Sequence, residues 1–515
     1  MAAFGVVLSL LPLAYVLLRT FQIGVGSLVD LTARPRTLEL ILNSLTLTFA
    51  VCLTAVAVGT IQAWATSRSD LKLKRVFQIV AVLPLAIPSY VLAYAWLAFN
   101  QNFDGFFGSW LVLSISTSPF VFLAVTAALA RHNSASEEVA RTLGKSQLQV
   151  ARSITWPAIK PAVLGSGLLV ALYTLSDFGA VSLMRFDTFT RAIYNAYRAS
   201  FDRDAAAAIA LLLILVTVIL VIAQGRITQV QAVKESDQFR YSKTKLNYWQ
   251  FLVSGVLTLW FVISIVIPVS SIMYWNLVGQ STAVTAEVLR ALINTLSYGL
   301  LGGLSVSAIG IAIAILVVRY RSQFGMRVEQ TILFTHALPG VVIALAFVFL
   351  VNQTLPALYQ TSILVIVAYV ALFLPNAVAV LKVPISQVPI GIEEVSRTLG
   401  SSQMQTIRRV IIPAAGPGIL SAIAFVALTV IKELPATLIL RPTGIETLAT
   451  RLWSATSINA FSAAAPYALL LIVVAGIPAL LVNREVQSSR KQSNLGSGQE
   501  SIISMNASFK GVSSD

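Results

Sequence analysis

The chain has 515 residues, of which 57% are hydrophobic and only 11% are charged, and its formal net charge is +15. This charged fraction excludes an ordinary soluble protein, in which about a quarter of the residues carry a charge. The basic residues lie between long apolar runs instead of forming one basic stripe, so the net charge indicates membrane topology and not nucleic-acid binding.

Twelve apolar runs are each about long enough to cross a bilayer as a helix. Helices are expected because an isolated strand would leave its backbone polar groups unsatisfied in lipid. In chain order the runs cover residues 4–18, 41–66, 76–99, 107–130, 162–183, 205–225, 251–275, 291–318, 329–352, 361–381, 416–440 and 463–483. We therefore predict an all-α integral membrane protein with twelve transmembrane helices.

The distribution of Lys and Arg predicts the orientation of these helices. With both termini in the cytoplasm, the inner gaps and the C-terminal tail hold 25 basic residues and the outer gaps hold 10. Basic residues are enriched on the cytoplasmic side of membrane proteins, so this count favours that orientation. Arg19, just after the first run, locally favours the opposite one. The first run lacks the features of a cleaved signal peptide, so we expect it to be a retained span.

The chain is poor in soft metal ligands. Cys52 is the only cysteine, and His132 and His336 are the only histidines. Disulfides within the chain, thiol redox chemistry and a metal cluster of His and Cys ligands are therefore excluded. We predict no stable metal site.

The second half of the chain repeats the first. Residues 137–144 read EEVARTLG and residues 393–400 read EEVSRTLG, an offset of 256. Other equivalent pairs are Pro157 and Pro413, Asp177 and Glu433, Arg185 and Arg441 and, with small shifts, Asn43 and Asn294 and also Pro84 and Pro339. Because six spans separate equivalent points, the two copies have the same orientation and form a parallel repeat.

The repeat predicts the domain organisation. The predicted units are a first six-span repeat (1–230, with its polar loop at 131–161), a cytoplasmic linker (231–250), a second repeat (251–484, with its loop at 383–417) and a disordered cytoplasmic tail (485–515). The tail is rich in Ser, Gly, Gln and Asn, a composition typical of disorder.

The repeated polar loop predicts a short helix. Ser134 and Glu137 have the spacing of a capping box, and Gly144 follows the last apolar position as a helix-terminating glycine does. A second helical stretch, residues 146–154, is expected to stop at Pro157 before the next span. The second copy has the same pattern.

The apolar and charged faces of this short helix indicate that it packs against another protein surface. Val139 and Leu143 are four residues apart and share one face, whereas Glu137, Glu138 and Arg141 lie on the others. So short a helix is marginally stable alone in water, so we expect it to pack against something.

The loop resembles the EAA loop of ATP-binding-cassette (ABC) importer permeases, in which Glu-Glu-x-x-Arg-x-Leu-Gly is followed by Ile-x-x-Pro. Val139 and Val395 stand where that family usually has alanine. The resemblance implies a permease of the type I kind, a bacterial inner-membrane location, and a docking loop in each half for one of two ABC ATPase subunits. The implied docking residues are Glu137, Glu138, Val139, Arg141, Leu143, Gly144, Pro157, Glu393, Glu394, Val395, Arg397, Leu399, Gly400 and Pro413.

The chain itself is predicted not to be an enzyme. Gly144-Lys145-Ser146 resembles the end of a P-loop, but Val139 stands where the leading glycine belongs, and Ser401 replaces Lys145 in the second copy. We therefore assign no catalytic residues and no cofactor to this chain, and the resemblance implies that ATP and magnesium bind to the partner ATPase.

Two predicted spans contain ionisable residues, Asp177 in one and Lys432 with Glu433 in the other. Such groups are costly in a membrane, and they mark either a substrate pathway or a buried pair. We take them, with Arg185 and Arg441, as candidate pathway residues. The equally favoured alternative is structural, with Lys432 neutralising Glu433, and Asp177 bonded to nearby backbone or to Arg185.

The segments 176–183 and 432–442 resemble the fused permeases of bacterial ferric iron importers. That resemblance implies a periplasmic ferric-binding protein as a partner, and a hard ferric ion suits carboxylate oxygen better than copper or zinc does. Fused permeases for thiamine and for phosphonates are similar as well. A secondary transporter driven by protons or sodium is the alternative from another class, but it has no need of two ATPase docking loops.

Overall fold

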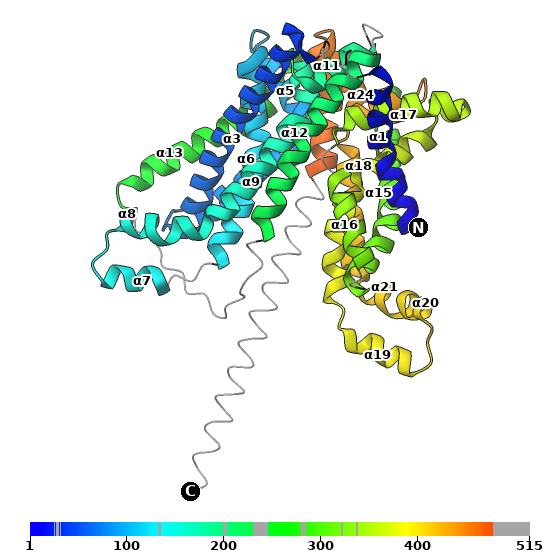
Figure 1. Ribbon diagram of the computed structural model, residues 1–515. Coiled ribbons are helices and arrows are strands. Elements are labelled where there is room, and N and C mark those ends of the chain that lie inside the picture. Colours follow the sequence, from blue (N-terminus) through cyan, green and yellow to red (C-terminus); the bar gives the residue numbers. More distant parts are fainter. Residues whose placement is uncertain are drawn as a thin grey trace.

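The computed structural model describes residues 1–476 apart from 25, 27–29, 31, 132–134, 199–202, 230–245, 280–284, 321–322 and 336–337. Over these described residues the secondary-structure elements are all helices, joined by turns and short connections, with no β-strand (Figure 1). Ser134, both histidines, most of the predicted linker and the whole predicted tail lie outside them. The predicted capping box at Ser134 therefore stays a prediction.

The first half of the chain contains five helices of 21 to 34 residues and several shorter ones. Its helices are α1 (Ala2–Ile23), α3 (Pro35–Arg68), α4 (Lys74–Val82), η1 (Leu83–Ala86), α5 (Ser89–Phe99), α6 (Gly105–Arg131), α7 (Ala135–Thr142), α8 (Gln147–Val150), η2 (Ala151–Thr155), α9 (Trp156–Ser176), α10 (Gly179–Leu183), α11 (Phe189–Arg198) and α12 (Arg203–Gln229). The long α3 and α6 lie beside each other.

The second half has a matching set. Its helices are α13 (Trp249–Phe261), η3 (Val262–Val266), α14 (Ile267–Val278), α15 (Ala286–Tyr320), α16 (Gln323–Thr335), α17 (Gly340–Thr354), η4 (Pro356–Leu358), α18 (Ser362–Gln387), α19 (Ile390–Thr398), α20 (Gln403–Thr406), η5 (Ile407–Ile411), α21 (Ile412–Ala414), α22 (Gly416–Ile431), α23 (Pro435–Leu440), α24 (Leu448–Ser457) and a last apolar helix, Phe461–Gly476. Here α15 and α18 lie beside each other, as α3 and α6 do in the first half.

Eight of the described helices are long and apolar enough to cross a membrane, or up to ten if two bent pairs are each counted as one span. The bent pairs are Lys74–Ala86 with Ser89–Phe99, at 96°, and Gln403–Ala414 with Gly416–Ile431, at 76°. The predicted runs 329–352 and 463–483 correspond to shorter apolar helices, Gly340–Thr354 and Phe461–Gly476. Length and composition thus support fewer full-length spans than the twelve predicted.

Small residues allow the central helices of each half to approach closely. A Cβ on Gly59 of α3 would lie 2.7 Å from the Cβ of Val121 in α6, and one on Gly303 of α15 would lie 2.7 Å from the Cβ of Ala427 in α22. Backbones this close gain van der Waals contact that lipid cannot replace. The helices α3, α6 and α9 form one core, and α15, α18 and α22 form the other.

The first span of each half packs against the other half. Helix α1 contacts α17 and α18, and α14 contacts α5. Tyr15 of α1 stacks on Phe349 of α17 with ring centroids 5.9 Å apart, and Trp275 of α14 donates a hydrogen bond of 2.8 Å to the carbonyl of Ala98 in α5. These two exchanged helices join the halves into one body.

Both repeated loops lie at the same end of the molecule, where α7 and α19 project away from the helix bundle, while α11 and α24 lie at the opposite end (Figure 1). We call these the loop end and the far end. This placement is the one that a parallel repeat requires.

The structure corrects one pair of equivalent positions. Pro339 precedes the first residue of α17, as Pro88 precedes the first residue of α5, and their backbone angles nearly coincide (φ −63°, ψ 147° and φ −58°, ψ 146°). The counterpart of Pro339 is therefore Pro88 and not Pro84, which lies within η1. Proline suits this position because a helix begins with N–H groups that have no partner within it.

Candidate functional site

The two loop helices end as predicted. Gly144 follows α7 with φ +81°, and Gly400 follows α19 with φ +83°. After each glycine an amide bonds back across the last turn, Lys145 to the carbonyl of Ala140 and Ser401 to that of Ser396. This left-handed stop favours glycine because other residues carry a Cβ that crowds the following carbonyl.

The apolar side chains of both loops are turned outward. Val139 is 57% exposed and Leu143 is 76% exposed, and the equivalent Val395 and Leu399 are 60% and 80% exposed. Apolar side chains arranged this way on a short helix fit a groove on a partner protein. We call these four residues the apolar knobs.

The structure corrects the predicted role of the first glutamate in each loop. Glu137 is only 4% exposed; its carboxylate accepts a hydrogen bond of 2.9 Å from Thr155 and lies 3.8 Å from the guanidinium of Arg68. The equivalent Glu393 pairs with Arg319 at 2.9 Å. Both carboxylates face their own chain because a buried arginine needs a counter-charge.

These two arginines hold the loops to the core helices. Arg68 closes α3 and donates to the carbonyl of Leu129 at 3.0 Å, and Arg319 near the end of α15 donates to the carbonyls of Ile385 and Val388. Neither arginine was among the residues predicted from the sequence. The signal was present, because each follows an apolar run at the same offset of 251 that relates Asn43 to Asn294.

Proline does not stop the helix that follows the first loop. A capping box formed by Ser146 and Gln149 begins α8, a wide π-turn follows, and Pro157 then lies in the first turn of α9. The prediction of a stop at Pro157 was therefore wrong: proline lacks an N–H, and the altered bonding of the π-turn accommodates it. In the second copy the chain instead bends by 76° between Ala414 and Gly416.

The two intramembrane acids begin short helices. Asp177 precedes α10 and accepts hydrogen bonds from the amide of Ala180, at 2.9 Å, and from the hydroxyl of Ser89. Glu433 precedes α23 and accepts from the amides of Ala436 and Thr437, at 2.7 and 2.9 Å, and from the hydroxyl of Thr437 at 2.7 Å. Each carboxylate thus satisfies helix N–H groups that would otherwise be unpaired.

The two acid-bearing segments meet across the boundary between the halves. A Cβ on Gly179 would lie 2.8 Å from the Cβ of Tyr90 and 3.4 Å from a methyl carbon of Leu434, the residue after Glu433. Phe178 stacks on Trp453 of the second half with centroids 5.1 Å apart. The two segments therefore pack against each other, although each carboxylate points into its own short helix.

Lys432 does not neutralise Glu433. Its ammonium donates a hydrogen bond of 2.8 Å to the carbonyl of Leu85, in the broken span of the other half. Arg185 likewise does not pair with Asp177 among the described contacts, but lies 3.4 Å from Asn459 and 3.9 Å from Asp104. Of the structural alternative, only the bond from Asp177 to nearby backbone is present.

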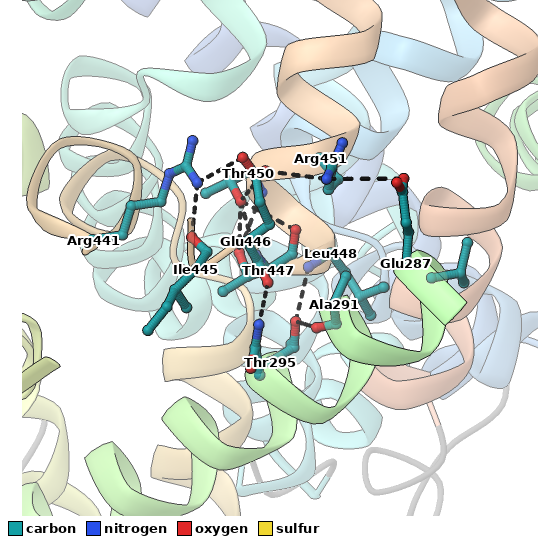
Figure 2. Close-up of polar contacts among 12 residues, drawn as sticks. Glu287, Ala291, Thr295, Arg441, Ile445, Glu446, Thr447, Leu448, Thr450 and Arg451 are labelled. Atoms are coloured by element: carbon teal, nitrogen blue, oxygen red, sulfur yellow. Dashed lines mark hydrogen bonds and ion pairs between the residues drawn. The ribbon is translucent and has the colours of Figure 1, made fainter. Parts of the chain in front are cut away.

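Arg441 belongs to an ion-pair network at the far end (Figure 2). It contacts Glu446 at 2.8 Å and the carbonyl of Ile445 at 2.7 Å, and Glu446 is in turn 3.4 Å from Arg451. Asn294 donates to the carbonyl of Glu446 at 2.9 Å. Arg441 thus fixes the loop after α23, and none of its described contacts is with Asp177 or Glu433.

The first half has a matching far-end network. Asp187 pairs with Arg36 and with Arg191, and its carbonyl accepts from Asn43 at 3.2 Å. The repeated Asn43 and Asn294 therefore have the same structural task, which is to hold the loop before α11 or α24.

Comparison with known proteins identifies the chain as a permease. The model of the family described as "Binding-protein-dependent transport system inner membrane component" matches residues 55–230 and again residues 306–486. A Fe(3+)-transport system permease protein of Haemophilus influenzae, FbpB 2, is 34% identical over 481 residues, which is 92% of this chain and 95% of that protein.

Two further relatives are more distant. A putative ferric transport system permease protein of the same species, FbpB 1, is 24% identical over 75% of this chain and 67% of its own length. The sulfate transport system permease protein CysT of Salmonella typhimurium is 25% identical over 35% of this chain and 70% of its own length.

These similarities and the apolar helices agree with each other. The two family matches fall one in each half, and the helices are those of a multi-pass inner-membrane protein. The family comprises permease subunits of ABC importers, which work with an ATPase and a periplasmic binding protein. The chain belongs to the family of binding-protein-dependent transport system inner membrane components.

Proposed function

We propose that this chain is the permease through which an ABC importer moves ferric iron from a periplasmic ferric-binding protein into the cytoplasm. The observation that carries the proposal is the pair of exposed apolar knob sets on matching helices at one end of the molecule. Two copies of a separate ATPase dock there, and they alone bind ATP and magnesium, since this chain has no Walker motif.

The loop anchors give the proposed coupling a physical route. Glu137 joins the first loop to Arg68 of α3, and Glu393 joins the second loop to Arg319 of α15. A rigid-body movement of the docked ATPases would therefore pass directly to the two core helices on which α6, α9, α18 and α22 pack.

Ferric iron is favoured over other substrates by the extent of similarity. The ferric permease relative aligns with both halves of this chain, whereas the sulfate permease aligns with 35% of it. The two intramembrane carboxylates, Asp177 and Glu433, suit a hard cation. Thiamine or a phosphonate is the alternative substrate within the same class.

Reconstitution in vesicles with the ATPase and the ferric-binding protein tests this function. We expect uptake of labelled ferric iron that requires ATP and the binding protein and that continues when ionophores collapse the proton and sodium gradients. Uptake that stops with the gradients and needs no ATP would establish a secondary transporter. Transport of thiamine or a phosphonate, with none of iron, would establish the alternative substrate.

We also propose twelve spans in two parallel six-helix repeats, with both termini in the cytoplasm. The two bent pairs and the two shorter apolar helices supply the four spans beyond the eight long ones. The excess of basic residues in the proposed inner segments supports the orientation.

Cysteine labelling tests this topology. With Cys52 removed, cysteines at Gln147 and Gln403 should react with a membrane-impermeant reagent only after the cells are opened, because both loops face the cytoplasm. These positions are exposed and leave the capping residues Ser146 and Ser402 intact. A cysteine at the exposed Asn352 should react from outside. Opposite results for Gln147 and Gln403 would rule out the parallel repeat.

A further inference from the structure

A buried phenol lies at the break of the third predicted span. Tyr90 is the second residue of α5, directly after the 96° bend, and it is only 3% exposed. Its hydroxyl has no hydrogen-bond partner within the described part of the chain. Buried hydroxyls almost always have a partner, so one without a partner calls for an explanation.

Tyr90 lies between the two segments that hold the intramembrane acids. A Cβ on Gly179, two residues after Asp177, would lie 2.8 Å from the Cβ of Tyr90 and 3.4 Å from a methyl carbon of Leu434, the residue after Glu433. Tyr369 shares a hydrogen bond of 2.6 Å with Thr437, which itself donates to Glu433. These groups come from both halves of the chain.

Asp177, the acid of the first half, is held next to Tyr90. Ser89, the neighbour of Tyr90, donates to Asp177, and the backbone at Gly179 packs against the Tyr90 side chain. We call Tyr90, Tyr369, Asp177 and Glu433 the oxygen cluster. No imidazole or thiol is recorded in it, and among the described residues no group of three or more His, Cys, Asp and Glu gathers anywhere.

Carboxylate and phenol oxygens are hard donors that favour small, highly charged cations. The Glu433 carboxylate accepts hydrogen bonds at the N-terminus of α23, and the Tyr369 hydroxyl shares one with Thr437. The Tyr90 hydroxyl is the oxygen of the cluster that has no such bond. A phenylalanine would fill the same space without burying a hydroxyl that has no partner. The Tyr90 hydroxyl is therefore available to a passing cation, whereas other buried hydroxyls without a partner, such as those of Ser114 and Ser307, lie within α6 and α15.

We infer that Tyr90 is a transient ligand of the ferric ion as it crosses the boundary between the two halves, an inference that rests on the proposed function. A bond from iron to the phenol oxygen forms as one bond from iron to water breaks, and the phenol proton passes to water. The oxidation state of the iron does not change. Few fixed carboxylates surround the site, so the ion is held weakly enough to leave again.

The test compares Tyr90→Phe with Tyr94→Phe in the reconstituted importer. Tyr94 lies one turn further along α5, and its hydroxyl donates a hydrogen bond of 2.7 Å to the carbonyl of Phe461. Iron uptake per permease and the thermal midpoint of unfolding are measured for both variants. The two readouts separate a ligand from a packing residue.

For Tyr90→Phe we expect iron uptake per molecule to fall about tenfold, which corresponds to about 1.4 kcal/mol in the translocation barrier. The thermal midpoint should stay the same or rise, because an unpaired buried hydroxyl is removed. Tyr94→Phe should show the reverse, a lower midpoint with normal uptake per molecule.

Unchanged uptake in Tyr90→Phe would overturn the inference while leaving the proposed function intact. A wild-type importer that carries no iron would instead overturn the proposed function. If Tyr90→Phe lowered both the midpoint and the amount of folded protein with normal uptake per molecule, Tyr90 would be a packing residue only.

Discussion

The double variant Leu143→Asp, Leu399→Asp should abolish iron uptake while inserting normally into the membrane. Both leucines are at least three-quarters exposed in this chain, so their replacement removes no internal contact of consequence. Burying each in a partner's groove would contribute about 2 kcal/mol. Losing both, and placing charges there, should weaken ATPase docking by about a thousandfold or more.

The measurements are co-purification of the ATPase and iron uptake normalised to permease amount. Leu73→Asp is the matched control: Leu73 is 72% exposed and lies after Arg68, hence at the loop end, but outside both loops. Its left-handed φ of 57° suits aspartate better than most residues. Normal ATPase docking in the double variant would show that the apolar knobs are not the contact.

The loops were predictable because they are governed by local rules. A helix of eight or nine residues, a left-handed glycine after it and an apolar pair four residues apart all leave a pattern in consecutive positions. Gly144 and Gly400 therefore appear in the structure where the sequence placed them, and their exposed neighbours Leu143 and Leu399 follow from the same periodicity.

The inward glutamates were not predictable from that periodicity. Glu137 and Glu138 are adjacent and have the same chemistry, and only one of them meets the buried Arg68, 69 positions earlier in the chain. Which glutamate turns inward depends on how the loop returns to the end of α3. A pattern within the loop contains no information on that long-range contact.

The breaks in the spans were not predictable from hydropathy. Hydropathy treats residues 416–440 as one run, but α22 ends at Ile431 and α23 begins at Pro435. The break creates a new helix start inside the membrane, and Glu433 caps it. A capping carboxylate and a pathway carboxylate look alike in the sequence, since both are single acids in an apolar run.

The capping geometry decides which acid can test the proposed pathway. In Glu433→Gln the amide group that replaces one oxygen could not accept from both the amide and the hydroxyl of Thr437. A buried N–H left without a partner costs about 1–3 kcal/mol, so we expect this variant to lower the amount of folded protein. It therefore cannot separate folding from transport.

Asp177→Asn should reduce iron uptake per molecule by about tenfold or more at normal protein levels. The asparagine oxygen can still accept from the amide of Ala180, and its amide can donate to the hydroxyl of Ser89, so both contacts survive without the charge. Only the attraction between the carboxylate and a ferric ion in the passage is lost.

The control for Asp177→Asn is Asp104→Asn, which removes an equal charge from an exposed carboxylate beside Arg185. Charge that merely attracts cations from solution acts over distance and is screened by salt, so its loss should affect uptake modestly and only at low ionic strength. Uptake that falls in Asp177→Asn at all salt concentrations, and not in Asp104→Asn, places the carboxylate at the ion. Equal uptake by Asp177→Asn and the wild type would exclude Asp177 from the pathway, leaving it only as the cap of α10.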